Sequence, residues 1–156
     1  MNADKPALAQ QPHAENFESA GFLRRHIQRT LDFYAPNAFD PAGGFFHYFS
    51  DDGSVYNRDH RHLVSATRFV FNWCMAYAHT GRPEYQRWAQ HALNHLRAFE
   101  LSNGLHAWAI NHGRIDDASV MAYGQAFVLL ARSHAHRVGL CGAGDIARSY
   151  ALMNDA

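Results

Sequence analysis

An arginine stands within a strongly apolar stretch of the chain. Arg68 lies in the segment 60–79, HRHLVSATRFVFNWCMAYAH, and is followed directly by three apolar residues. A guanidinium keeps its charge, so its burial among such side chains is costly unless it is paired or faces a polar cavity. Two roles are open for Arg68: a structural partner for loop carbonyls or a carboxylate, or a donor to a hydroxylated or anionic ligand.

Three further polar residues lie near the beginnings of apolar stretches. His62 precedes the apolar run that contains Arg68, and Tyr123 and Gln125 interrupt the similar segment 117–137, DASVMAYGQAFVLLARSHAHR. Each side chain can hydrogen-bond a ligand, and each serves equally well to cap a loop or satisfy a backbone group. We predict that Arg68 and Tyr123 point into one shared concave surface.

The chain has 12 histidines, and some of them have spacings that suit a metal site. His91 and His95 are four residues apart, and His134 and His136 are close together. However, no HExxH pattern is present, the pair at 91 and 95 falls on the polar side of the segment 83–99, and a site needs a third ligand and an outer shell. We predict no functional metal site.

Two loops of the sequence resemble each other. The segments 43–55, GGFFHYFSDDGSV, and 103–115, NGLHAWAINHGRI, each hold two glycines nine positions apart, with aromatic and polar residues between them. The equivalent glycines of the two segments are 60 positions apart. The apolar stretches that follow align with Phe69–Val70 over Phe127–Val128, a spacing of 58. Repetition at this period is typical of stacked or toroidal helical hairpins.

The apolar periodicity predicts an all-α chain with both glycine loops at the same end. We expect helices near 15–35, 60–79, 83–99 and 117–137 and the start of another helix after them. The stretches at 60–79 and 117–137 are apolar on nearly every side, which is typical of inner helices, whereas the others have one polar face. Residues 1–14 are expected to form a flexible N-terminus, and residues 15–156 the N-terminal part of a single domain.

Composition and known motifs exclude several classes of function. Lys+Arg and Asp+Glu are both 14, so no net charge favours nucleic acid or an anionic membrane. The two cysteines form no disulfide framework, and no apolar run is long enough for a signal or a membrane span, so we expect a cytoplasmic protein. Neither a phosphate-binding P-loop nor a GxSxG nucleophile motif is present. The acidic pairs lie beside glycines and read as loop residues rather than glycosidase carboxylates.

Taken together, these motifs resemble the N-acylglucosamine 2-epimerase superfamily. The resemblance rests on GGFFHYFSDDGSV followed by RHLVSATRFVF, and on GLHAWAINHGRIDDASVMAYGQAFVLLA, and it extends from about residue 17 to the end of the chain. It is strongest to the aldose–ketose isomerase branch of the superfamily. It implies an α/α barrel (toroid) of helical hairpins, with inner helices lining a sugar pocket, and an enzyme that needs no metal or redox cofactor.

The resemblance also implies roles for individual residues. Arg68 matches an arginine that hydrogen-bonds the sugar, Tyr123 a pocket tyrosine, and His62 a polar residue at the pocket mouth. Gln125 stands where several members of the superfamily have histidine. Val120 stands where many have lysine, so no role attached to that lysine is carried over.

The length of the chain differs from the family pattern. The barrel of the superfamily has six hairpins. At the repeat spacing of 58–60 residues, 156 residues hold about two and a half of them, so we expect the N-terminal part of a longer barrel. The family's two proton-transfer histidines are expected further along such a barrel, so no catalytic residue is assigned here. The sequence therefore predicts part of the pocket of a mannose–fructose type isomerase acting through an enediol, inactive when isolated and prone to self-association.

Two alternatives remain beside this prediction. One is an N-acylglucosamine or cellobiose 2-epimerase, which shares the enediol chemistry and differs in where the proton returns. The other is a non-catalytic helical repeat that binds a partner through its inner helices. In both enzyme cases the partner would be a sugar substrate.

Overall fold

The computed structural model describes residues 16–35 and 37–154. Their helices follow the predicted order closely, and the expectation for residues 1–14 lies outside the described residues. The helices are α1 (Ala20–Tyr34), α2 (Leu63–Thr80), α3 (Pro83–His95), the short 3₁₀ helix η1 (Leu96–Phe99), α4 (Ala122–Arg137) and α5 (Ala143–Asn154). None of the helices in this part of the chain is both long and apolar enough to cross a membrane.

Local sequence signals explain where several helices begin and end. The Ser19 hydroxyl accepts a hydrogen bond from the backbone N–H of Phe22 and so caps the start of α1. Gly81 ends α2 in the left-handed conformation, at φ 69°, and Pro83 stands in the first turn of α3. The signals at Gly81 and Pro83 are local, which is why the sequence located the end of α2 and the start of α3 well.

The prediction of an all-α chain was wrong in one respect, because both glycine loops and the residues that follow them form short strands. Residues 60–62 and 117–121 were expected to be helical, but they lie before α2 and α4. Arg61 and His62 form a strand, and Asp117 is the last residue of another. The strands are β1 (Tyr48–Phe49), β2 (Val55–Asn57), β3 (Arg61–His62), β4 (Ala109–Asn111) and β5 (Arg114–Asp117). They form a two-stranded sheet, β1–β2, and a three-stranded antiparallel sheet, β3–β4–β5.

The internal repeat is present in the backbone itself. A bridge joins Phe39 to Phe45 in the first loop region, and an equivalent bridge joins Glu100 to His106 in the second. The equivalent glycines also share the left-handed conformation, with φ values of 70° and 83° at Gly44 and Gly104 and of 83° and 71° at Gly53 and Gly113. The repeated sequence therefore specifies the same chain path twice.

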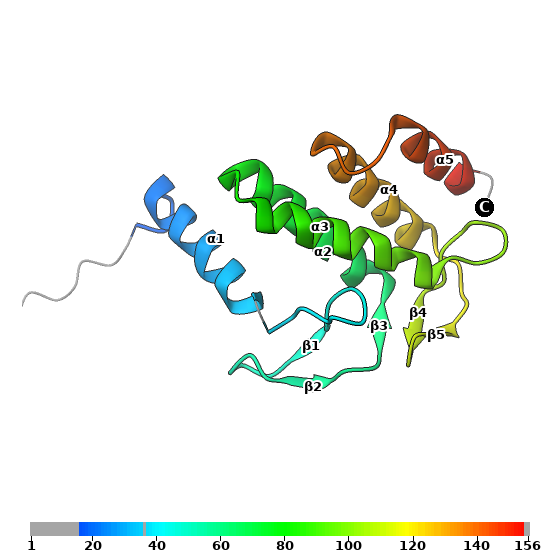
Figure 1. Cartoon of the computed structure of the whole chain (residues 1–156), viewed down its shortest axis with the longest axis horizontal. Coiled ribbons are helices and arrows are strands. Elements are labelled where there is room, and N and C mark those ends of the chain that lie inside the picture. The colour runs from blue at the N-terminus through cyan, green and yellow to red at the C-terminus, as the bar shows by residue number, and fades with distance from the viewer. Residues whose placement is uncertain (1–15, 36, 155–156) are drawn as a thin grey trace, which may run out of the picture.

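The helices form two layers, with all the strands at one end (Figure 1). α2 packs against α3 on one side and α4 on another, and α4 packs against α5, as expected if α2 and α4 are inner helices. Because β3 precedes α2 and pairs with β4 of the second loop, the two loops lie at the same end, as predicted. The largest fully buried side chains come mainly from α2, η1 and β4: Trp73, Phe99, Leu63, Leu96, Ile110 and Val70.

Candidate functional site

Arg68 lies on the exposed side of α2, so its charge is not buried among the apolar residues that follow it in the sequence. Its guanidinium lies over the ring of Phe127 from α4, with 5.2 Å between the guanidinium carbon and the ring centroid. A cation–π contact stabilises the guanidinium without using its outer N–H groups as hydrogen-bond donors. Those groups are thus available to a ligand on the open side of the helix.

Tyr123 lies on the same surface as Arg68, because both contact Phe127. The rings of Tyr123 and Phe127 have centroids 4.9 Å apart, and Tyr123 is 56% exposed. We call this surface the α2–α4 face and define it by the exposed side chains that follow one side of each helix: Arg68, Asn72, Met75, Tyr123, Ala126 and Leu130. The shared location agrees with the prediction, whereas the concave shape remains a prediction.

The imidazole ring of His62 caps the start of α2. Its Nδ1 accepts a hydrogen bond from the backbone N–H of Val64 at 3.2 Å, which leaves the proton on Nε2. Burial, the nearby His60 and the positive charge of Arg68 lower the pKa of His62. His62 is therefore a neutral imidazole near pH 7, with Nε2–H as a donor.

The second glycine loop adds Trp108 to this end of the fold. Its indole ring lies edge-on to the His62 ring, with centroids 4.2 Å apart, and its backbone carbonyl accepts a hydrogen bond from Leu63 N–H. Trp108 was not among the site residues predicted from the sequence. Its position in the repeated aromatic loop was the available signal, since that loop precedes an inner helix.

Gln125 does not belong to the α2–α4 face, which corrects its predicted assignment to the sugar pocket. The side chain is only 4% exposed. Its carboxamide nitrogen donates to the backbone carbonyl of His106, and its oxygen accepts from the His106 N–H, at 2.8 Å and 3.1 Å. Both hydrogen bonds fasten the second glycine loop to α4, so Gln125 has a structural role.

The first glycine loop is fastened by a buried ion pair and a histidine. Arg61 is 4% exposed and donates to a carboxylate oxygen of Asp40 at 2.9 Å. His91, which was predicted to lie on a solvated helix face, instead contacts the carbonyl oxygens of Asp40 and Gly44 through Nε2 at 2.9 Å and 3.0 Å. The ring of His95 packs so closely on Gly44 that a Cβ there would lie 2.4 Å from it. Both histidines therefore hold the loop.

Two buried histidines hold their protons weakly. Burial and then the charge of Arg61 lower the pKa of His47 to about 3, and His47 Nδ1 accepts from the backbone N–H of His62 at 3.0 Å. Burial and then the charge of Arg132 lower the pKa of His106 to about 4. Both rings are therefore neutral in the folded protein at pH 7.

We predict that this burial makes the folded protein less stable in mild acid. Because the folded-state pKa of each ring lies below the ordinary value of 6.5, stability is complete above pH 6.5 and falls as the pH drops toward 3–4. Each of the two histidines should cost about 1.4 kcal/mol per pH unit within that window. Urea unfolding at a series of pH values measures the slope, which His106→Gln should reduce. The matched control, His79→Gln at an exposed position, should leave the slope unchanged; equal slopes in all three proteins would contradict the prediction.

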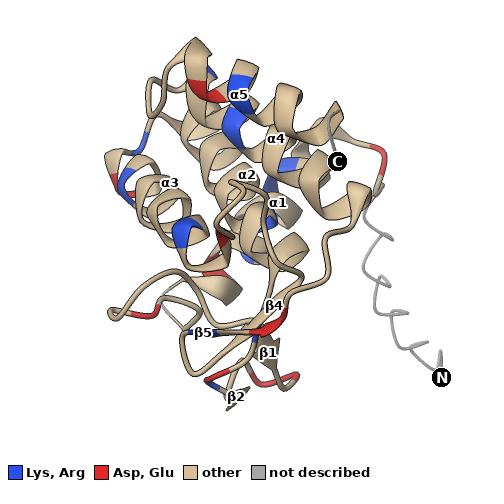
Figure 2. Cartoon of the chain, turned by 90° about the vertical axis from the view of Figure 1, so that its right-hand side faces the viewer, with Lys and Arg blue, Asp and Glu red and all other residues tan. Residues whose placement is uncertain are grey.

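The described residues bring together no group of three or more His, Cys, Asp or Glu side chains that could hold a metal ion. In Figure 2 the basic residues lie mainly on the helices, and the acidic residues mainly on the loops and strands.

Comparison with known proteins identifies the family. The family model of N-acylglucosamine 2-epimerase matches residues 44–154, which include both glycine loops, α2 and α4. The chain belongs to the N-acylglucosamine 2-epimerase family. Members of this family that resemble the chain are sugar isomerases and epimerases.

Individual members of the N-acylglucosamine 2-epimerase family agree with this assignment. The D-mannose isomerase of Marinomonas mediterranea is 47% identical over 125 residues, covering 80% of this chain and 32% of that protein. A crystal structure of D-mannose isomerase superposes with a TM-score of 0.87 at 42% identity, covering 91% of this chain and 37% of that one. The cellobiose 2-epimerase of Bacillus thermoamylovorans, at 21% identity and a TM-score of 0.72, shares the fold over 83% of this chain and 34% of its own. The chain thus spans about a third of the length of these relatives.

Proposed function

We propose that this chain forms part of the sugar pocket of an aldose–ketose isomerase that interconverts mannose and fructose. The observation that carries the proposal is the α2–α4 face, where Arg68 and Tyr123 flank Phe127 on the exposed side of two inner helices. The D-mannose isomerase relative, 47% identical, favours this reaction over others in the family. In this proposal, the chain corresponds to the N-terminal two and a half hairpins of an α/α barrel.

The proposed chemistry is proton transfer beside a carbonyl. The sugar ring opens, a base removes the C2 proton while the carbonyl oxygen O1 takes up a proton, and an enediol forms. Return of a proton to C1, with loss of the proton on O2, gives the ketose. Arg68 donates hydrogen bonds to the oxygens on which negative charge develops. Tyr123 and the Nε2–H of His62 supply further polar contacts, and Trp108 adds an apolar wall beside His62. The base itself is proposed to lie outside the matched third of the barrel.

Isolated from the rest of a barrel, the chain is proposed to self-associate. Apolar side chains remain open to solvent on the α2–α4 face, with Met75 45% and Leu130 39% exposed. In addition, α1 and α2 leave an apolar groove between them, lined by Ile27 and Phe71 among others. Exposed apolar surface of this extent favours association.

The proposal is tested by restoring the missing part of the barrel. In the Marinomonas mediterranea D-mannose isomerase, the aligned 125-residue segment is replaced by the matching residues of this chain. We expect this hybrid to convert mannose to fructose and to exchange deuterium from solvent at C1 and C2, measured by NMR. The 156-residue chain alone should give no catalysed exchange.

Other results would contradict the proposal in distinct ways. An inactive but folded hybrid, beside an active parent enzyme, would show that these residues do not supply a working pocket. Conversion of mannose to glucose without fructose would favour the 2-epimerase alternative. Catalysed exchange by the chain alone would show that it contains its own base.

A further inference from the structure

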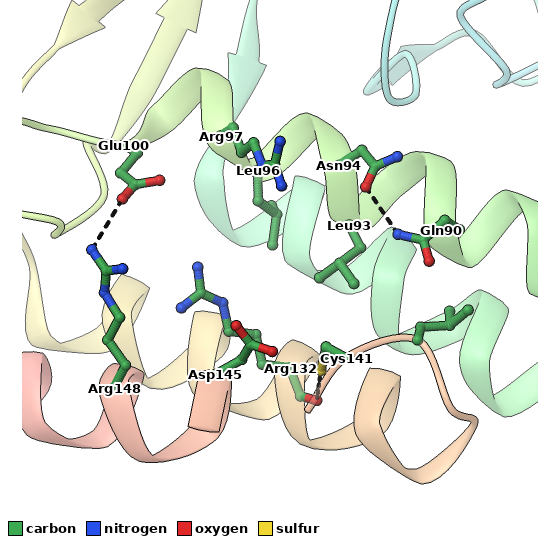
Figure 3. A pocket seen from close by; sticks show the side chains of 11 residues that line it. Gln90, Leu93, Asn94, Leu96, Arg97, Glu100, Arg132, Cys141, Asp145 and Arg148 are labelled. Atoms are coloured by element: carbon green, nitrogen blue, oxygen red, sulfur yellow. Dashed lines mark hydrogen bonds and ion pairs between the residues drawn. The ribbon is translucent and has the colours of Figure 1, made fainter. Parts of the chain in front are cut away.

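A cavity lies away from the α2–α4 face. It has a volume of about 300 Å³ and lies between α3 and η1 on one side and α4 and α5 on the other (Figure 3). Arg132, which lines it, stands nine residues after Tyr123 and therefore half a turn away around α4. We call this cavity the arginine cleft, and it is separate from the proposed sugar pocket.

The cleft has charged walls and an apolar base. Three arginines line it, Arg97 from η1, Arg132 from α4 and Arg148 from α5. Two carboxylates line it as well, those of Glu100 and Asp145. Three leucines and a cysteine, together with two side-chain amides, complete the lining: Leu93, Leu96, Leu140, Cys141, Gln90 and Asn94. The charged side chains thus leave one positive charge in excess.

The existing contacts leave donors of these arginines unused. Arg148 reaches Glu100 only at 3.7 Å, which is too long for a hydrogen bond. Arg132 donates one N–H to the Ser149 hydroxyl at 2.6 Å, and in Figure 3 its guanidinium points into the cleft. Arg97 is exposed, and its guanidinium makes no hydrogen bond or ion pair with another residue in the described part of the chain. The Asp145 carboxylate is already engaged by the backbone N–H of Gly142 at 2.8 Å.

We propose that the arginine cleft binds the phosphate group of a small phosphorylated molecule. A phosphate presents three oxygens, and guanidinium groups match that geometry with paired N–H donors. The apolar base, with Leu93 and Leu140, accommodates a short carbon chain, and the volume lies at the small end of ligand pockets. The carboxylates of Glu100 and Asp145 disfavour a polyanion, because each additional phosphate would meet negative charge. The proposal does not depend on the reaction proposed for the α2–α4 face.

The test uses the full 156-residue chain and three probes: inorganic phosphate, glycerol 1-phosphate and glycerol. Each is titrated while amide NMR signals are followed, with sodium chloride at matched ionic strength as the reference. We expect saturable shifts at residues of η1 and α5, with a midpoint on the order of 1 mM for phosphate and a lower one for glycerol 1-phosphate. Glycerol should cause no such shifts.

Variants separate a defined site from general attraction of anions. Arg97→Gln removes guanidinium donors that make no hydrogen bond or ion pair in the described chain. It should raise the midpoint of the phosphate titration at least about five-fold. Arg148→Gln should raise the midpoint of the phosphate titration in the same way. The same spectra show whether this variant is folded. Arg87→Gln on α3 removes an equal charge outside the cleft and should leave the midpoint unchanged. Shifts that grow linearly, match those of chloride, or persist in both cleft variants would overturn the proposal.

Discussion

Replacement of Arg68 by alanine in the hybrid enzyme is expected to lower kcat/KM for mannose isomerisation about 100-fold. The expected size follows from losses on removing a donor that stabilises a developing oxyanion, which are on the order of 10²–10³. The loss should appear mainly in kcat, because the charge on the sugar oxygens develops only in the transition state. Initial rates of fructose formation over a range of mannose concentrations measure both parameters.

A second arginine provides the matched control for Arg68. Arg87→Ala changes an exposed arginine on α3, which packs on the opposite side of α2 from the proposed pocket, and kcat/KM should stay within about two-fold of the hybrid. Lysine at position 68 should recover only part of the activity, since an ammonium lacks the planar fork of donors. An Arg68→Ala hybrid as active as the Arg87→Ala hybrid would remove Arg68 from the proposed pocket.

Replacement of Arg61 by alanine is expected to reduce the free energy of unfolding by about 3–5 kcal/mol. Arg61 donates to Asp40 at 2.9 Å and to the carbonyl of His60 at 3.1 Å, and the side chains of the ion pair are only 5% and 18% exposed. Its loss would leave the Asp40 carboxylate partly buried without a partner and would release the first glycine loop from β3. Urea unfolding of the 156-residue chain, followed by the fluorescence of its three tryptophans, measures the change.

Arg58 offers a close control for Arg61. Both guanidinium groups lie over the ring of Phe46, at 4.9 Å and 4.8 Å, but Arg58 is exposed. Arg58→Ala should therefore cost only about 0.5–1 kcal/mol, the usual value of an exposed cation–π contact. If both variants lost the same stability, the ion pair with Asp40 would contribute nothing measurable, and the loop would be held by its other contacts.

Much of the fold follows from local sequence. The side-chain period of 3.6 residues distinguishes α1 and α3, which have one polar side, from α2 and α4. Gly81 and Pro83 mark a helix end and a helix start through backbone preferences that need no distant partner. The equivalent glycines of the two loops predicted the repeat correctly, because a left-handed φ favours glycine in each copy.

The role of single polar residues followed from the sequence less reliably. Arg68 lies on the predicted helix, but the sequence left open whether it is a structural residue or a ligand donor; its charge is not buried, because most apolar neighbours along the chain point away from it around the helix. Gln125 and Tyr123 stand two positions apart, so one is buried against the second loop and the other is exposed. A rotation of about 200° between such positions separates a structural residue from a candidate ligand residue.

What the sequence alone determined is the set of helices, their polar and apolar sides, the repeat and the family, since each depends on residues near one another in the chain. Tertiary structure decided which polar side chains are available to a ligand. His91 contacts a loop carbonyl 47 residues away, Arg61 pairs with Asp40 across 21 residues, and Arg68 meets Phe127 from another helix. The physical reason is that burial and pairing depend on contacts between distant segments, and no local period or spacing specifies them.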